Sequence, residues 1–138
     1  MIMKNFEVKE LGDFLYKLSL KGKESRMRSR FVSMLEAHLA QVNAERQQLI
    51  DEFAKKDEKG EFLVEIEDGV ETLVFENRRE FNREMAILMN EDFIIEESKD
   101  KAEMIEAVKG ILYTYGEATE MSGDSAMLFD RFCEILGI

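Results

Sequence analysis

The stretch SRMRSRFVSMLEAHLAQVNAERQQLIDEFAK, residues 25–55, contains neither glycine nor proline. Such an uninterrupted segment favours one continuous helix, and Ser25 is a good residue to cap its start. At 1.5 Å per residue the helix would be about 45 Å long, which exceeds the diameter of a compact domain of this size. We therefore expect part of it to protrude or to meet a partner chain. Its apolar residues recur along one side: Phe31, Leu35, Leu39, Val42, Leu49 and Phe53.

A basic segment, LSLKGKESRMRSRF at residues 18–31, overlaps the start of this helix in a chain whose net charge is -11. On a helical projection with Leu35 at zero, Arg28 and Arg46 both fall at about +20°, inside the apolar stripe. Since an unpaired buried guanidinium is costly, we predict that carboxylates from other elements pair with both arginines as structural ion pairs. The remaining cations of the segment project outward as a candidate interaction surface: Lys21, Lys23, Arg26 and Arg30.

The sequence FLVEIEDGVETLVF, residues 62–75, predicts a β-hairpin. Asp68 and Gly69 suit the positive φ angles of a type I′ turn, and both flanks are rich in branched residues. Large apolar side chains then share one face, which must pack on helices or on another protein. In this register Glu67 pairs with Val70, Val64 lies opposite Leu73, and Phe62 lies opposite Phe75.

The rest of the chain alternates helical patterns with breaks. Residues 2–8 alternate loosely, which allows a short strand or an irregular arm. A short helix is expected from Leu11 until Gly22 interrupts the pattern, with a turn joining it to the long helix. Further helices are expected at 77–89, 98–116 and 127–136, with a short strand within 92–97. The expected fold is α+β and mainly helical, with about five helices, the hairpin and one or two further short strands in a single domain of residues 1–138.

Composition favours an ordinary globular protein. Its 138 residues are 45% hydrophobic and 36% charged, which is too apolar for a disordered acidic tail. One cysteine cannot form an intramolecular disulfide, and no apolar run reaches membrane-spanning length. We therefore expect a cytosolic protein that makes no membrane contact.

Residues capable of catalysis or metal binding are scarce. Cys133 lies in a strongly apolar helical pattern, which is typical of an inert packed thiol, and His38 lies at the edge of the stripe of the long helix. A Cys–His dyad is the alternative interpretation, less favoured than packing for both residues. Two such side chains are too few for a structural zinc site. We expect a non-enzymatic protein with no catalytic residues, no metal and no cofactor.

The segment LSLKGKESRMRSRFVSML, the long helix after it, the sequence KKDEKGEF and the acidic hairpin together resemble a family of small proteins encoded by tailed phages and prophages of Gram-positive bacteria. The resemblance is strongest over residues 18–62 and covers most of the chain. Members of this family have no assigned function, so the resemblance supplies no active site. It implies a viral protein made in the cytoplasm of a bacterial host, where it stays or joins the virion.

Three functions follow as hypotheses. The first is a phage accessory or structural protein that acts through contacts with a phage or host protein, or through a homo-oligomer formed by the long helix or the hairpin. The second is an acidic anti-defence inhibitor that occupies a nucleic-acid-binding groove of a host protein. The third is weak nucleic-acid binding through the Lys21–Arg30 segment. Nucleic acid is the least favoured partner, because nearby acids repel phosphates and no stacking aromatics are interleaved.

Overall fold

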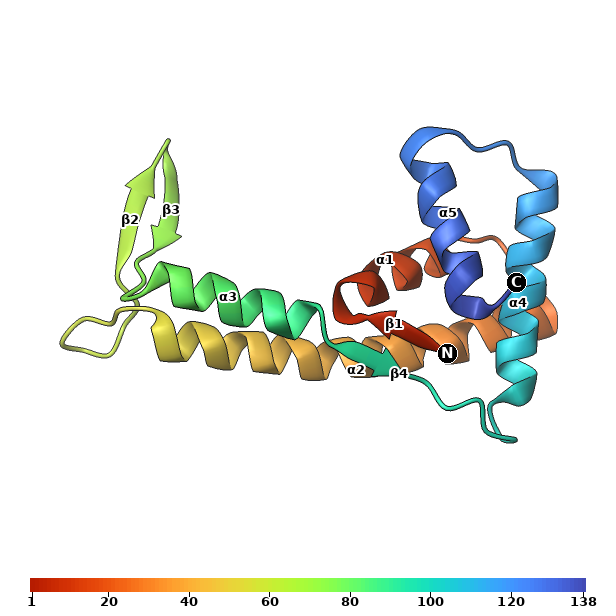
Figure 1. Ribbon diagram of the computed structural model, residues 1–138, viewed down its shortest axis with the longest axis horizontal. Helices are drawn as coiled ribbons and strands as arrows, with labels where there is room; N and C mark the ends of the chain where they lie inside the picture. Colours follow the sequence, from red (N-terminus) through yellow and green to blue (C-terminus); the bar gives the residue numbers. More distant parts are fainter. The chain divides into compact units, whose positions relative to one another are not determined.

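The computed structural model describes residues 1–138, which form two compact units. Unit 1 comprises Met1–Leu39 and Asp92–Ile138, and unit 2 comprises Ala40–Glu91. Helix α2, Gly22–Phe53, contributes residues to both units (Figure 1). The expected α+β, mainly helical fold is confirmed, with five helices and two two-stranded antiparallel sheets. The expectation of a single domain of residues 1–138 stays a prediction.

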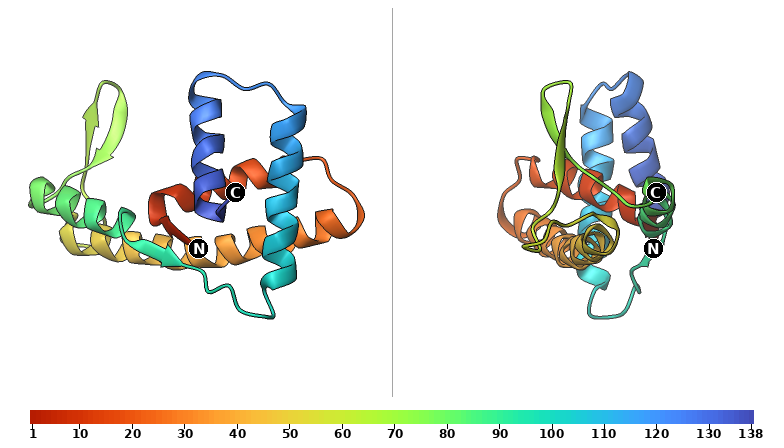
Figure 2. Two further views of the ribbon diagram at one scale, coloured as in Figure 1. Left: turned by 45° about the vertical axis from the view of Figure 1, so that its right-hand side comes forward. Right: turned by 90° about the vertical axis from the view of Figure 1, so that its left-hand side faces the viewer.

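Unit 1 contains three complete helices, the first part of α2 and one small sheet. In the sheet, β1 pairs with β4 in an antiparallel register that sets Ile2 opposite Ile94 and Met3 opposite Phe93. Figures 1 and 2 show α4 and α5 running antiparallel side by side. The elements that belong wholly to unit 1 are β1 (Ile2–Lys4), α1 (Asn5–Tyr16), β4 (Asp92–Ile94), α4 (Ala102–Ala118) and α5 (Gly123–Leu136).

Helix α1 begins earlier than its apolar periodicity predicts. The expected start was Leu11, whereas the helix starts at Asn5, directly after a strand that ends at Lys4. A local hydrogen bond explains the change, because the Glu7 carboxylate accepts from the backbone N–H of Lys4 at 2.9 Å. This contact satisfies a backbone donor at the helix start. The alternation at residues 2–8 therefore divides into a short strand and the first turn of α1.

The core of unit 1 lies where α1, α2, α4 and α5 meet. Edge-to-face packing of Phe14 on Tyr115, at 5.1 Å between ring centres, extends it on one side. On α2 the predicted stripe is buried at Phe31 and Leu35, whereas Leu39 is half-buried. The most completely buried side chains of the core are Met3, Val8, Leu11, Leu15, Phe31, Leu35, Ile105, Val108, Leu112 and Phe132.

Gly116 permits the close approach of α4 to α5. A Cβ atom at this position would lie 2.9 Å from Cζ of Phe129 on α5, closer than packed carbon atoms approach. A Cβ atom at Gly110, six residues earlier on α4, would have no atom within 4 Å. The two glycines of α4 therefore have different roles, and only Gly116 is required by packing.

Unit 2 combines the last part of α2 with the hairpin of β2 (Val64–Glu67) and β3 (Val70–Leu73) and with α3 (Arg78–Met89). The predicted register is confirmed along both strands, from Glu67 opposite Val70 to Val64 opposite Leu73. Asp68 and Gly69 have φ angles of 51° and 79°, as a type I′ turn requires. Within unit 2, α3 runs antiparallel alongside the end of α2 (Figures 1 and 2).

The base of the hairpin differs from the prediction, because Phe62 and Phe75 do not pair. The segment after α2 enters between them, so that Lys56 pairs with Phe62 and Ala54 pairs with Phe75. The Lys55 N–H donates to the Val74 carbonyl at 2.8 Å, and the Lys55 carbonyl accepts from Leu63 at 2.9 Å. This pairing explains why α2 ends at Phe53 rather than at Lys55. At its other end α2 begins at Gly22, three residues before Ser25.

A cluster of three phenylalanines fixes the hairpin base on α3. The Phe75 ring stacks on Phe81 with centres 4.2 Å apart, and Phe53 approaches the same ring at 6.1 Å. The predicted helix start at Asn77 is confirmed, since its side-chain oxygen accepts from the Glu80 N–H at 3.1 Å. Helix α3 is therefore anchored at its N-terminal end by both a cap and an aromatic contact.

Candidate interaction surfaces

The β2–β3 hairpin carries apolar side chains that nothing in unit 2 covers. Val64 and Ile66, on the face predicted to be packed, are 52% and 73% exposed. On the opposite face Val70 is 62% exposed. Only the base of the predicted apolar face is packed, through Phe75 on α3. The upper half of that face is open.

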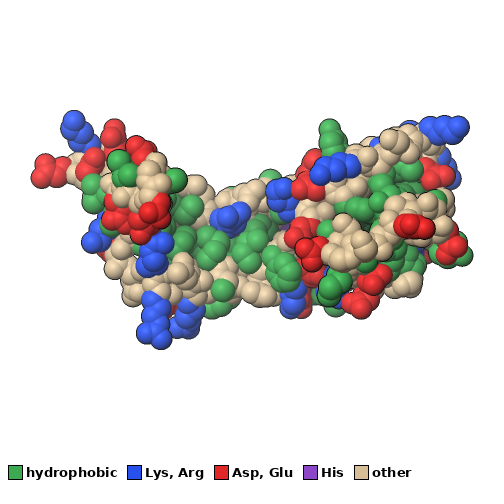
Figure 3. Space-filling view, turned by 90° about the horizontal axis from the view of Figure 1, so that it is seen from above, with side chains coloured by type: hydrophobic (Ala, Val, Ile, Leu, Met, Phe, Trp, Pro, Cys, Tyr) green, Lys and Arg blue, Asp and Glu red, His purple; other side chains and the backbone are tan.

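Acidic side chains surround these apolar groups. The strands and the turn carry Glu65, Glu67, Asp68 and Glu71, all exposed and none in an ion pair. Figure 3 shows acidic and hydrophobic side chains side by side over the part of unit 2 that carries the hairpin, at the left of that view. The strands and the turn thus combine apolar area with four carboxylates that form no ion pair within the chain.

Arg28 turns inward as predicted, but its partners are not carboxylates. Its Nη1 atom donates to the carbonyls of Leu15 at 2.8 Å and Leu18 at 2.6 Å, with Tyr16 at 3.4 Å. The last carbonyls of a helix lack partners within the helix, and the several donors of a guanidinium suit such a cluster. The expected ion pair of Arg28 is therefore wrong. The residue instead fixes the end of α1 and the loop after it.

The predicted ion pair of Arg46 is also wrong, for a different reason. It is exposed and its contact is with Asn43 Oδ1, 3.4 Å away on the same helix. In this part of α2 only α3 and the hairpin base pack within the unit, so a long side chain reaches solvent even from the apolar stripe. The predicted structural ion pair of Arg46 does not exist.

The four outward cations are exposed, as expected, but they do not form one free basic surface. Lys23 forms an ion pair with Glu103 on α4, and its hydrogen bond holds the pKa of that carboxyl below its ordinary value. Arg30 directs Nη1 toward the Met27 sulfur at 4.0 Å. Lys21 and Arg26 have no ion pair within the chain. Binding through this candidate surface stays a prediction.

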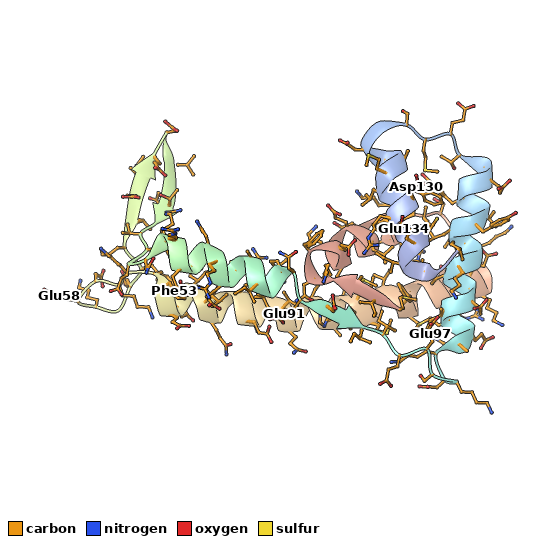
Figure 4. All side chains as sticks on the ribbon, in the orientation of Figure 1. Phe53, Glu58, Glu91, Glu97, Asp130 and Glu134 are labelled. Carbon is orange, nitrogen blue, oxygen red and sulfur yellow. The ribbon has the colours of Figure 1, made fainter.

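His38 and Cys133 have local roles in unit 1. The His38 Nε2 atom lies 2.7 Å from Asn5 Oδ1, and its ring stacks on Phe93 at 3.7 Å. Burial raises the pKa of the half-buried Cys133 thiol, and the carboxylate of Asp130 on the same helix raises it further (Figure 4). A raised pKa disfavours the reactive thiolate. No group of three or more His, Cys, Asp or Glu side chains is arranged to hold a metal ion.

An ion pair between Glu7 and Arg131, which no pattern in the sequence predicts, joins α1 to α5. Arg131 donates from Nε to Glu7 Oε2 at 2.6 Å and from Nη2 to Oε1 at 3.1 Å. The hydrogen bond from Arg131 is the main cause that holds the pKa of the buried Glu7 below its ordinary value, although burial alone would raise it. Arg131 also reaches Glu134, which Figure 4 labels on α5. No local pattern connects residues this far apart in the chain.

Unit 1 contains a groove with a volume of about 770 Å³. Its walls come from the end of α1, the loop into α2, the last turns of α4 and the first turns of α5. A shallower hollow of 410 Å³ continues from it along the loop, and the two share Ser19, Leu20 and Glu24. The apolar lining of the groove is Phe14, Leu18, Leu20, Ile111, Tyr115, Ala118 and Leu128.

None of the helices combines the length and the apolar character that crossing a bilayer requires. Comparison of the chain with protein-family models, with curated proteins and with solved structures gives no match. A proposal about function therefore rests on the geometry of these surfaces.

Proposed function

We propose that the chain is a non-enzymatic accessory or structural protein of a tailed phage or prophage, acting through protein contacts in the bacterial cytoplasm or in the virion. The observation that carries the proposal is the exposed apolar face of the hairpin, where Val64 and Ile66 are 52% and 73% exposed. Its phage setting rests on the family resemblance of the basic segment, the long helix and the acidic hairpin.

The weak core of unit 2 supports a role in partner binding. It has three buried apolar side chains, Val42, Ala54 and Leu88. A two-stranded hairpin is marginally stable alone, and both of its strands are edges with free backbone groups. A unit of this kind gains stability when another protein covers its apolar face.

Charge indicates what kind of partner fits the hairpin. A second copy of the hairpin would bring Glu65, Glu67, Asp68 and Glu71 against the same four acids, which opposes association. A partner with an apolar centre and basic rim would bury Val64 and Ile66 and pair with these carboxylates. The hairpin therefore favours a different protein over a second copy of this chain.

Affinity capture with two matched variants tests the proposal. The double variant Val64→Thr, Ile66→Thr removes exposed apolar groups, whereas Val70→Thr does so on the opposite face; threonine keeps the β-branched shape in both. Lysates of infected cells are passed over each protein, and retained proteins are quantified by mass spectrometry. We expect a phage or host protein retained by wild type and by Val70→Thr, and about tenfold less by the double variant.

Two outcomes would count against the proposed function or its placement on the hairpin. A chain that is monomeric by light scattering and retains no protein contradicts the proposal. Equal retention by the double variant contradicts the assignment of the contact to this face.

A second candidate, the acidic inhibitor of a host nucleic-acid-binding protein, is favoured by the same unpaired acids of the hairpin. It requires a basic host protein as the captured partner and an affinity that falls steeply with salt, because exposed charges are screened. A contact dominated by Val64 and Ile66 keeps most of its affinity in salt. Titration of the captured complex at low and high ionic strength separates the two functions.

A further inference from the structure

The groove of unit 1 has rigid walls for a surface that contains a loop. Arg28 holds the loop by donating to the Leu18 carbonyl, and the same guanidinium holds the end of α1 through Leu15. On the other side, Phe14 packs edge-to-face on Tyr115, and both rings line the groove. Because its walls are fixed by these contacts, the groove is a preformed hollow rather than a gap in a mobile segment.

The main hollow of the groove has three acids and one lysine in its lining. Glu10 and Glu24 line it without an ion pair, whereas the third acid, Asp13, is paired with Lys9 at 2.6 Å. Lys17 is the one cation of this lining, and Lys21 lies on the second hollow that continues from it. The last turn of α4 ends in the groove at Ala118 and contains no basic residue, so the partial negative charge of this helix end is not offset. In the main hollow a cationic occupant is therefore favoured over an anionic one.

The shape of the groove is elongated. Its 770 Å³ continues into the second hollow over Ser19, Leu20, Lys21 and Glu24. Apolar side chains occupy the deeper part and the free carboxylates of Glu10 and Glu24 are exposed. A compact small molecule would fill one part of such a surface, whereas a peptide segment can follow its length.

We propose that this groove binds an amphipathic helix of another protein, with apolar side chains at i, i+3 or i+4, and i+7 toward the groove and lysine or arginine on the flanks. The apolar side chains lie over Phe14, Ile111 and Leu128, and the flanking cations face Glu10 and Glu24. Recognition of an amphipathic helix by an apolar groove with complementary rim charges is a recurring mode of peptide binding. The site lies in unit 1 and does not depend on the hairpin contact.

Fluorescence anisotropy with synthetic peptides tests the site. The probe is a labelled peptide with leucines at helical spacing and lysines on its flanks. The comparison peptides have the same composition in scrambled order, or glutamates in place of the lysines. We expect the first peptide to bind at least about tenfold more tightly than either of the others, because only it matches both the apolar lining and the charge.

Variants of the exposed groove residues locate the binding. Thr114→Arg places a long side chain into the groove, and Glu10→Lys with Glu24→Lys reverses its free charges; we expect each to weaken the leucine–lysine peptide by about tenfold. Glu96→Lys is the control for a charge change elsewhere on unit 1, since Glu96 is exposed, has no ion pair and does not line the groove. It should leave the affinity within about twofold.

Several results would overturn the site. They are equal binding of the scrambled peptide, an equal loss with Glu96→Lys, and unchanged affinity of Thr114→Arg when its fold is intact by circular dichroism. The hairpin variant Val64→Thr, Ile66→Thr is included in the same titration. It should bind the peptide as wild type does, so that failure of the groove and failure of the hairpin contact are seen separately.

Discussion

Unit 1 and unit 2 share one helix but have different sources of stability. Of the buried apolar side chains, seventeen belong to unit 1 and three to unit 2. Unit 1 is held by a core in which side chains from four helices meet, whereas unit 2 relies on one helix pair and a three-phenylalanine cluster. Burial of apolar surface is the main favourable term in folding, so a partner of unit 2 can add stability that unit 1 already has.

Truncation of a core ring is the strongest way to test this difference. Phe132 of unit 1 is fully buried, so Phe132→Ala should reduce the free energy of unfolding by about 3–5 kcal/mol. A truncation on the hairpin of unit 2, Ile66→Ala, removes a side chain that is 73% exposed and should change this free energy by less than about 0.5 kcal/mol. Urea unfolding followed by circular dichroism measures both. Similar losses would contradict the assignment of the core to unit 1.

A substitution at the α4–α5 contact of Gly116 should have the next largest effect on stability. Gly116→Ala forces a methyl group against Phe129 and should destabilise unit 1 by about 1–3 kcal/mol. Gly110→Ala has free space on the same helix and should stabilise by about 0.5–1 kcal/mol, because alanine is the better helix former. Thermal unfolding of the pair is the measurement. A stabilised Gly116→Ala would show that α4 and α5 can separate at no cost.

Arg28 and Arg46 lie at the same angle on α2. The stability cost of truncating each one therefore compares the two units directly. Arg28→Ala leaves the carbonyls of Leu15 and Leu18 without their donor and should cost about 1–2 kcal/mol. Arg46→Ala removes one exposed contact to Asn43 and should stay within about 0.5 kcal/mol. Chemical denaturation of both variants decides the matter. Equal costs would mean that α2 has the same environment in both units.

The ion pair of Glu7 in unit 1 should contribute less to the free energy of unfolding, and its contribution should depend on pH. Its pKa is lowered in the folded protein, so the stability it contributes is present above the ordinary value of 4.5 and is lost as the pH falls through the folded pKa. Glu7→Gln should therefore cost about 1 kcal/mol at pH 7 and less at acidic pH. Unfolding measured between neutral and acidic pH checks this. A cost independent of pH would contradict the ion pair as its source.

Local patterns in the sequence predicted much of the fold. The uninterrupted segment after Gly22, the Asp68-Gly69 turn and the cap at Asn77 each act over a few residues, and all three appear as expected. The register of the hairpin follows from its turn alone. Expectations failed where a distant segment intervened, as when the chain after α2 entered between Phe62 and Phe75.

Contacts between distant segments were decided by the tertiary structure. The sequence indicated that Arg28 turns inward, but its carbonyl partners depend on where α1 ends in space. Glu7 and Arg131 meet because α1 packs on α5, and the groove exists because α1, the loop after it, α4 and α5 converge. Helical periodicity gives the direction of a side chain and not the group it meets. The sequence by itself therefore determined the elements and the exposed charge, and the packing determined the partners, the groove and the unequal cores.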